Sequence, residues 1–133
     1  MLPAMAKILD ANIVIRFLVE DDKVKTDAVE KLFRSEEILI LTDVTISEIV
    51  WVLSSYYDVS RMEIVKKITT LIHLPSIRCD KKIVLIALSL FEKYNIDWID
   101  AYLAAYAEEN SIDGVYSYDR DLDKVKKIKR REP

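Results

Sequence analysis

Short apolar runs alternate along the chain with longer segments in which apolar residues recur at helical spacing. The short runs predict strands at residues 6–9, 38–41, 76–79 and 115–118, and a weaker one at 128–130. The periodic segments predict helices at residues 12–20, 26–35, 45–57, 61–74, 81–94 and 98–110. Short strands separated by helices are typical of βαβ units, so we expect a three-layer α/β domain with a parallel sheet flanked by helices.

The chain is expected to form one domain over residues 1–133, because no repeat, low-complexity tract or Pro/Gly/Ser-rich linker divides it. Its longest uncharged apolar run, residues 83–91, is too short to cross a bilayer. Cys79 is the only cysteine and forms no internal disulfide, and no cationic start precedes an apolar stretch at the N-terminus. We therefore expect a cytoplasmic protein without a membrane span.

Scarce residue types exclude several kinds of site. Gly114 is the only glycine, so the chain lacks a Gly-rich phosphate-binding loop. His73 and Cys79 are the only residues of their types, which excludes a structural zinc site and makes a His-based triad improbable. Carboxylates remain, with 23 Asp and Glu residues in total.

Three carboxylates follow predicted strands: Asp10, Glu48 and Asp119. The carboxyl ends of parallel strands share one edge of a sheet, which is where such folds bind ligands. Asp97 and Asp100 stand three residues apart at the start of a predicted helix, adjacent on its first turn. If the fold brings this pair to the same edge, four or five carboxylates meet there.

Each of these acids also has a purely structural explanation. Asp10 can cap the helix that follows it, and Thr45 to Glu48 fits a capping box. Asp97 and Asp100 fit the first turn of a helix, where the helix dipole favours acids. Asp119 can open a turn.

Capping alone does not account for a cluster of acids. Two unit charges about 4 Å apart repel by roughly 4 kcal/mol at an effective dielectric near 20, whereas a cap contributes about 1 kcal/mol. Either the acids share a proton or a divalent cation lies among them. Ligands that are all oxygen suit Mg²⁺ or Mn²⁺.

The sequence resembles the PIN-domain ribonucleases, and among them the VapC-type toxins of toxin–antitoxin pairs. The resemblance rests on the motifs at residues 8–22, 43–64, 96–110 and 114–125, in the order and spacing of that family. It implies a parallel sheet of about five strands and a metal-dependent endoribonuclease. It also implies RNA as the substrate, a homodimer, and a small antitoxin that binds a hydrophobic groove and blocks the active site.

The resemblance also implies roles for individual residues. Asp10, Glu48, Asp100 and Asp119 match the acidic quartet of the family, and Asp97 its accessory acid. We expect Asp10, Asp97, Asp100 and Asp119 to hold Mg²⁺ or Mn²⁺, and Glu48 to act as a ligand or as a base for the attacking water. The residues expected to support them are Asn12, Ser117 and Asp121.

The net charge of −3 is unusual for a nucleic-acid enzyme, although bound metal would neutralise the catalytic acids. Arg16 and Arg120 are our candidates for contacts to RNA phosphates. The basic stretch at residues 124–131 can contact RNA, hold a partner or form a solvated tail. Trp51 and Tyr56 are more typical of a core than of an interface.

Two other functions remain open at this point. One is a PIN-domain nuclease that processes RNA without an antitoxin. The other is a non-catalytic acidic module that binds metal ions or proteins. Retention of a carboxylate at all four quartet positions disfavours an inactive domain.

Overall fold

A computed structural model of the chain describes residues 5–133, so the first four residues of the predicted domain lie outside the described residues. The chain divides into two compact units, Met1–Asp80 and Lys81–Pro133, which we call the N-terminal and C-terminal units. Each is described by itself, and a single domain over the whole chain stays a prediction. Within residues 5–133, no helix combines the length and apolar character that a membrane crossing requires.

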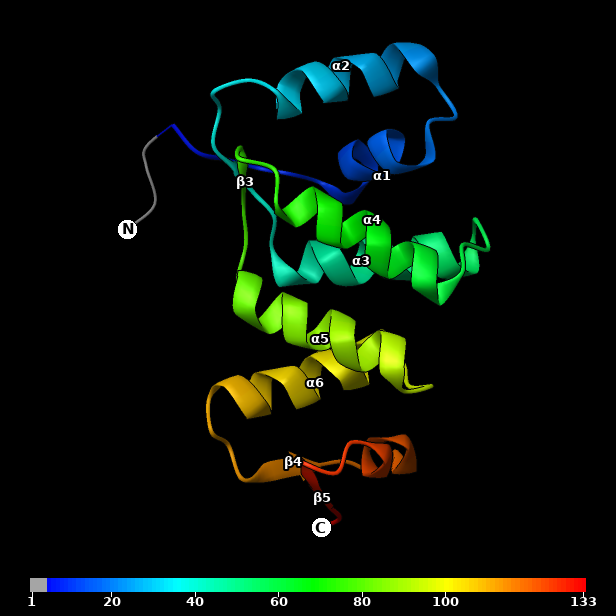
Figure 1. The fold of residues 1–133 in the computed structure, drawn as a ribbon, viewed down its shortest axis with the longest axis vertical. Coiled ribbons are helices and arrows are strands. Elements are labelled where there is room, and N and C mark those ends of the chain that lie inside the picture. Colours follow the sequence, from blue (N-terminus) through cyan, green and yellow to red (C-terminus); the bar gives the residue numbers. More distant parts are fainter. Residues whose placement is uncertain (1–4) are drawn as a thin grey trace. The chain divides into compact units, whose positions relative to one another are not determined.

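The N-terminal unit contains three strands and four helices (Figure 1). In chain order they are β1 (Lys7–Ile8), α1 (Ala11–Val19), α2 (Lys23–Phe33), β2 (Leu39–Ile40), α3 (Asp43–Ser55), α4 (Arg61–Ile72) and β3 (Ile77–Arg78). The strands pair in the order β1-β2-β3, all parallel, with Leu39 of β2 opposite Lys7 and Ile77. Each connection between paired strands contains helices, as parallel pairing requires.

The C-terminal unit begins with two helices that lie side by side, as Figure 1 shows. Its elements are α5 (Lys81–Lys93), α6 (Trp98–Glu109), β4 (Gly114–Tyr116), the 3-10 helix η1 (Arg120–Lys124) and β5 (Lys129–Arg131). The two strands pair in parallel, with Gly114 opposite Lys129.

The expected α/β class with short parallel pairing is confirmed, and all six predicted helices are present. The arrangement of strands differs from the prediction. Among the described residues, the five strands form a three-stranded sheet and a two-stranded sheet rather than one sheet of five. The C-terminal basic stretch is not a solvated tail either, because Lys129–Arg131 pairs with β4.

The core of the N-terminal unit comes mainly from α3, α4 and β2. Its largest fully buried side chains are Leu39, Leu41, Ile46, Ile49, Leu53, Ile64, Ile68, Leu71 and Ile72. On each helix these residues recur at spacings of three or four, which places them on one buried face of the helix. Burial of each such side chain stabilises the fold by about 1.5–3 kcal/mol.

Alanines on α6 allow it to pack closely within the C-terminal unit. Ala101, Ala104 and Ala105 are all 0% exposed, as is Ala87 on α5. The small alanine side chains let a neighbouring element approach closely. Their packing therefore fixes the position of the first turn of α6.

Two aromatic residues expected in the core are instead at the surface. Trp51 is 66% exposed and Tyr56 is 77% exposed. Trp51 lies on α3 opposite the face that carries Ile49 and Leu53, both of which are 0% exposed. The prediction was wrong because residue type alone does not indicate which face of an amphipathic helix is buried.

Gly114 is required by the close approach of β4 to β5. A Cβ atom at this position would lie 2.2 Å from the backbone oxygen of Lys129. We expect Gly114→Ala to lower the free energy of unfolding by about 1–3 kcal/mol, the usual cost of overpacking. Chemical denaturation followed by circular dichroism measures this change, with Asp113→Ala, an exposed position just before β4, as the control. Equal stability of the two variants would contradict the close approach.

Candidate metal centre

Three aspartates of the C-terminal unit lie together. Asp97, Asp100 and Asp119 each present a carboxylate oxygen, and these three oxygens all lie within 4.8 Å of one another. We call these residues the acidic triad. Two of them come from the start of α6, and the third comes from the segment after β4.

Asp97 and Asp100 are placed by the first turn of α6. Asp97 stands at the N-cap position with an extended backbone, but its side chain makes no capping hydrogen bond. The expected capping function of Asp97 is therefore absent, and its exposed carboxylate is available to a ligand. Asp100 follows three residues later and is only 8% exposed. Residues three apart on a helix are neighbours on its surface, so the two carboxylates converge.

Asp119 is held by local hydrogen bonds on both sides. The Ser117 Oγ accepts a hydrogen bond from the Asp119 backbone N–H at 3.0 Å. The Asp121 backbone N–H donates to Asp119 Oδ1 at 2.9 Å, which caps η1. Ser117 and Asp121, both expected to support the site, thus each form a hydrogen bond with Asp119, and Asp121 does so through its backbone N–H.

The pKa values of Asp100 and Asp119 are shifted in opposite directions. Burial raises the pKa of Asp100 to about 6, and a hydrogen bond and charge repulsion from Asp119 add to the effect. The pKa of Asp119 is lowered, first by the hydrogen bond from the Asp121 backbone N–H and then by its interaction with Asp100. At neutral pH the triad therefore concentrates negative charge around one buried carboxylate.

The residues present fit a hard divalent cation. Oδ2 of Asp100 is buried without a hydrogen-bond partner, and a buried carboxylate oxygen without a partner is costly. Two ionised carboxylates at this distance repel each other. The closeness of Asp100 to Asp119 is therefore stabilised either by a proton that they share or by a cation. The three donors are all carboxylate oxygens, the ligand type that Mg²⁺ and Mn²⁺ prefer.

The other two predicted acids belong to the N-terminal unit. Asp10 caps α1, because its Oδ1 accepts a hydrogen bond from the Ala11 backbone N–H at 2.9 Å. Glu48 is the sixth residue of α3 and is exposed. The helix begins after Thr42, whose Oγ1 accepts from the Thr45 backbone N–H at 3.2 Å. The capping-box explanation of Glu48 was therefore wrong, and the joining of Asp10 and Glu48 to the triad stays a prediction.

The predicted phosphate contacts have different environments. The Arg16 guanidinium donates to Asp21 Oδ1 at 2.8 Å and to the Tyr57 hydroxyl at 3.0 Å, and these partners raise its pKa. Arg16 is thus already held by an acid within its own unit. Arg120 is exposed directly beside Asp119, so its position suits a phosphate contact better.

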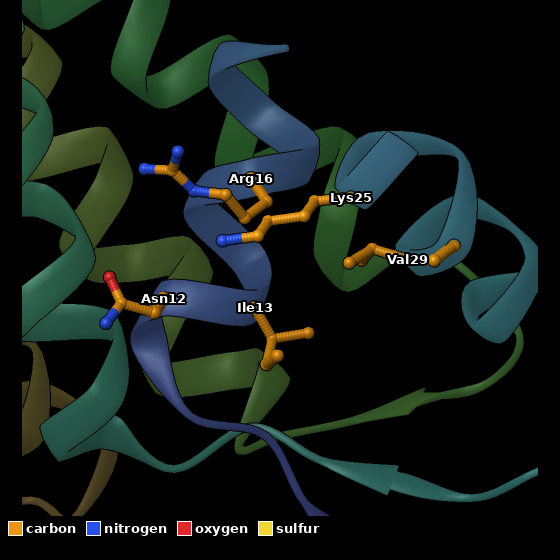
Figure 2. A pocket seen from close by; sticks show the side chains of 6 residues that line it. Asn12, Ile13, Arg16, Lys25 and Val29 are labelled. Carbon is orange, nitrogen blue, oxygen red and sulfur yellow. The ribbon is translucent and has the colours of Figure 1, made fainter. Parts of the chain in front are cut away.

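Asn12 and Arg16 both line a hollow between α1 and α2 (Figure 2). Ile13 from α1 and Val29 from α2 form part of its apolar wall, and Lys25 reaches toward α1. Its volume is about 480 Å³, within the range of about 300–1,000 Å³ that is usual for ligand pockets. Asn12, which lines the hollow, thus stands two residues after Asp10 in the sequence.

Lys124 is a residue of this region that the sequence did not single out. Its Nζ donates to the backbone oxygen of Asn95 at 3.0 Å and forms an ion pair with Asp121 at 3.2 Å. It therefore ties η1 to the segment just before Asp97. Within the basic stretch, no local pattern distinguishes Lys124 from its neighbours, because the contact joins residues 29 apart in the chain.

Removal of the Ser117 hydroxyl tests how strongly the triad depends on its support. We expect Ser117→Ala to weaken Mn²⁺ binding by about 10-fold to 100-fold, the usual effect of removing a group that orients a ligand. The cause is the lost hydrogen bond to the Asp119 backbone N–H. Isothermal titration calorimetry measures the affinity, and Ser117→Thr, which keeps the hydroxyl, is the control. Unchanged binding by Ser117→Ala would show that Asp119 needs no such support.

Comparison with known proteins identifies the family. A family model of the PIN domain matches residues 7–128 and thus covers almost the whole chain. A search of curated proteins finds no match. PIN domains are in general nucleases that use divalent metals and act on RNA, in keeping with the acidic triad. The chain belongs to the PIN domain family.

Proposed function

We propose that this protein is a divalent-metal-dependent endoribonuclease and the toxin of a type II toxin–antitoxin pair, of VapC type. Family membership indicates a metal-dependent nuclease in general. The observation that supports a metal most directly is the buried Oδ2 of Asp100, which has no hydrogen-bond partner and belongs to a cluster of three carboxylates. A cation at this position would satisfy that oxygen and offset the repulsion.

We assign roles by the chemistry of each side chain. Asp97, Asp100 and Asp119 hold Mg²⁺ or Mn²⁺, with Asp10 as a further ligand. Glu48 is a ligand or accepts a proton from the attacking water. The bound ion supplies a water of lowered pKa and draws charge from the phosphate. Arg120, exposed beside Asp119, contacts a non-bridging oxygen of the scissile phosphate.

The hollow between α1 and α2 supports an inhibitory protein partner. Its apolar wall suits the hydrophobic side chains of a small antitoxin. One end of the hollow is lined by Asn12, two residues from the proposed ligand Asp10. An antitoxin segment that filled the hollow would therefore lie beside Asp10 and obstruct access to that proposed ligand.

The exposed face of α3 supports a homodimer. Val44 and Trp51 lie seven residues apart on one side of α3 and are 81% and 66% exposed, and Tyr56 follows at the end of the helix. Large exposed apolar side chains that share a face mark interaction surfaces. We expect Trp51→Glu to convert a dimer into a monomer, as measured by sedimentation equilibrium, because it places a charge within this face.

Cleavage assays with purified protein test the nuclease. Labelled RNA is incubated with Mg²⁺, Mn²⁺ or EDTA, beside Asp100→Asn and the matched control Asp113→Asn, an exposed acid of the same unit outside the triad. We expect cleavage in either metal by the wild type and by Asp113→Asn, and none in EDTA. Cleavage that persists in chelator would refute the metal mechanism.

Expression in cells separates the toxin from an RNA-processing nuclease. A toxin arrests growth when expressed alone, and co-expression of the small protein encoded beside it restores growth. A processing nuclease that needs no antitoxin would be tolerated alone. Asp100→Asn serves as the control, since it removes a proposed metal ligand and is expected to be harmless.

A further inference from the structure

We propose that a groove along α5 binds a nucleotide of the RNA strand beside the cleavage site. This inference rests on the proposed ribonuclease function and extends it to a second binding site. The groove lies between α5 and the segment after η1, with a volume of about 550 Å³. We call it the α5 groove, and the residues that carry the argument are Leu85, Leu90, Lys93, Tyr94, Lys126 and Lys127.

The floor of the α5 groove suits a nucleobase. Leu85, Leu90 and Val125 contribute apolar surface, and Tyr94 contributes an aromatic ring that is partly exposed. Single-stranded RNA is recognised mainly by stacking of unpaired bases on aromatic side chains, and this stacking tolerates any sequence. The groove therefore offers the surface that one unpaired base needs.

The rim of the α5 groove suits a phosphate. Lys93, Lys126 and Lys127 line it, and Glu108 is its only lining acid, paired with Lys127 at 3.5 Å. Two lysine charges therefore remain in excess on the rim, although the whole protein carries a net charge of −3. The Lys93 Nζ lies 5.3 Å from the centroid of the Tyr94 ring, so a cation and a stacking surface are adjacent.

The α5 groove and the acidic triad are connected by the chain and by contacts of Lys124. Tyr94 is three residues before Asp97, and Lys124 joins the intervening Asn95 to Asp121. The end of the groove at Tyr94 therefore leads into the segment that presents Asp97. A strand whose phosphate reached the triad would have its next nucleotides beside this end, where charge complementarity favours RNA.

Binding in EDTA tests the groove independently of cleavage. Fluorescence anisotropy measures the Kd of a labelled 12-nucleotide single-stranded RNA over a range of salt concentrations. We expect Tyr94→Ala to raise Kd by about tenfold, from the loss of one stacked base. The double variant Lys93→Ala/Lys126→Ala should weaken binding and reduce the slope of log K against log salt by about 1.4, about 0.7 for each lost phosphate contact.

Matched variants distinguish a specific effect of the groove from a general loss of positive charge or of folding. Tyr94→Phe keeps the ring and should bind as the wild type does. Lys81→Ala, an exposed lysine on α5 outside the groove, should leave Kd and the salt slope nearly unchanged. Equal weakening by Lys81→Ala and by the double variant Lys93→Ala/Lys126→Ala would overturn the inference, as would tight binding of an acidic peptide in place of RNA.

Cleavage kinetics distinguish failure of the groove from failure of the nuclease. With a 12-nucleotide RNA, the groove variants should raise KM and leave kcat nearly unchanged, whereas with a trinucleotide they should match the wild type. RNA binding through the groove without any cleavage would refute the nuclease and leave the groove standing. Cleavage with kinetics insensitive to Tyr94→Ala would refute the groove alone.

Discussion

Asp100→Asn is expected to reduce kcat/KM for RNA cleavage in Mg²⁺ by about a thousandfold, the largest effect of any single change in the triad. A coordinated cation supplies several kcal/mol of stabilisation to the transition state, and about 1.4 kcal/mol corresponds to a factor of ten in rate. Asp100 is the buried member, and its Oδ2 has no other partner. An amide in its place keeps one oxygen ligand but loses the charge that binds the ion.

The same substitution should stabilise the metal-free protein at neutral pH. A neutral amide avoids the cost of a buried charge and can donate a hydrogen bond to the Asp119 carboxylate. Thermal unfolding in EDTA at pH 7.5 measures this, and the Tm of Asp100→Asn should exceed that of the wild type. A variant that lost both activity and Tm would indicate a structural role for Asp100, whereas opposite changes fit a metal ligand.

The helix boundaries show which structural features local sequence signals predict. The predicted helix at 26–35 begins earlier, at Lys23, because Asp22 caps it by accepting from the Lys25 backbone N–H at 3.2 Å. Val24 in this first turn is 80% exposed, so no apolar periodicity marks it. Helix interiors were predicted well because burial imposes periodicity, and helix starts were less accurate because capping side chains leave a weaker pattern.

The strands and the site include further features that local sequence patterns do not predict. The apolar run at 38–41 predicted a strand of four residues, and the strand itself spans Leu39–Ile40. The flanking residues still join the sheet, because the Ile38 carbonyl accepts from the Lys7 N–H at 2.9 Å and the Leu41 N–H donates to the Arg78 carbonyl at 2.8 Å. The position of Asp119 after a strand was predicted from sequence. Its meeting with Asp100 depends on packing between α6 and η1, which no short-range signal encodes.

Loss of stability with rising pH is the second large expected effect in the metal-free protein. Asp100 has a pKa of about 6 when folded, against an ordinary value of 3.8. Between these values the folded state keeps a proton that the unfolded state has lost, so the free energy of unfolding falls as pH rises. The slope is at most about 1.4 kcal/mol per pH unit, and water around the exposed Asp97 and Asp119 reduces it further.

Asp119 acts in the opposite direction and in another range of pH. Its pKa is lowered in the folded state, so its contribution is present above the unfolded value of 3.8 and is lost as pH falls below it. Urea denaturation in EDTA between pH 4 and 6.5 therefore isolates Asp100. The wild type should lose stability across this range relative to Asp100→Asn, which has no carboxyl group to titrate there.

Metal should reverse this pH dependence. Mn²⁺ binds the deprotonated triad, so its stabilising effect grows as pH rises through the pKa of Asp100. At a concentration 100 times Kd, the ion adds about 2.7 kcal/mol to the free energy of unfolding. Repeating the denaturation in Mn²⁺ should then give a wild type that becomes more stable toward neutral pH, whereas Asp100→Asn should respond little. A wild type whose stability is the same in Mn²⁺ and in EDTA at pH 7 would mean that the repulsion within the triad is relieved by something other than a cation.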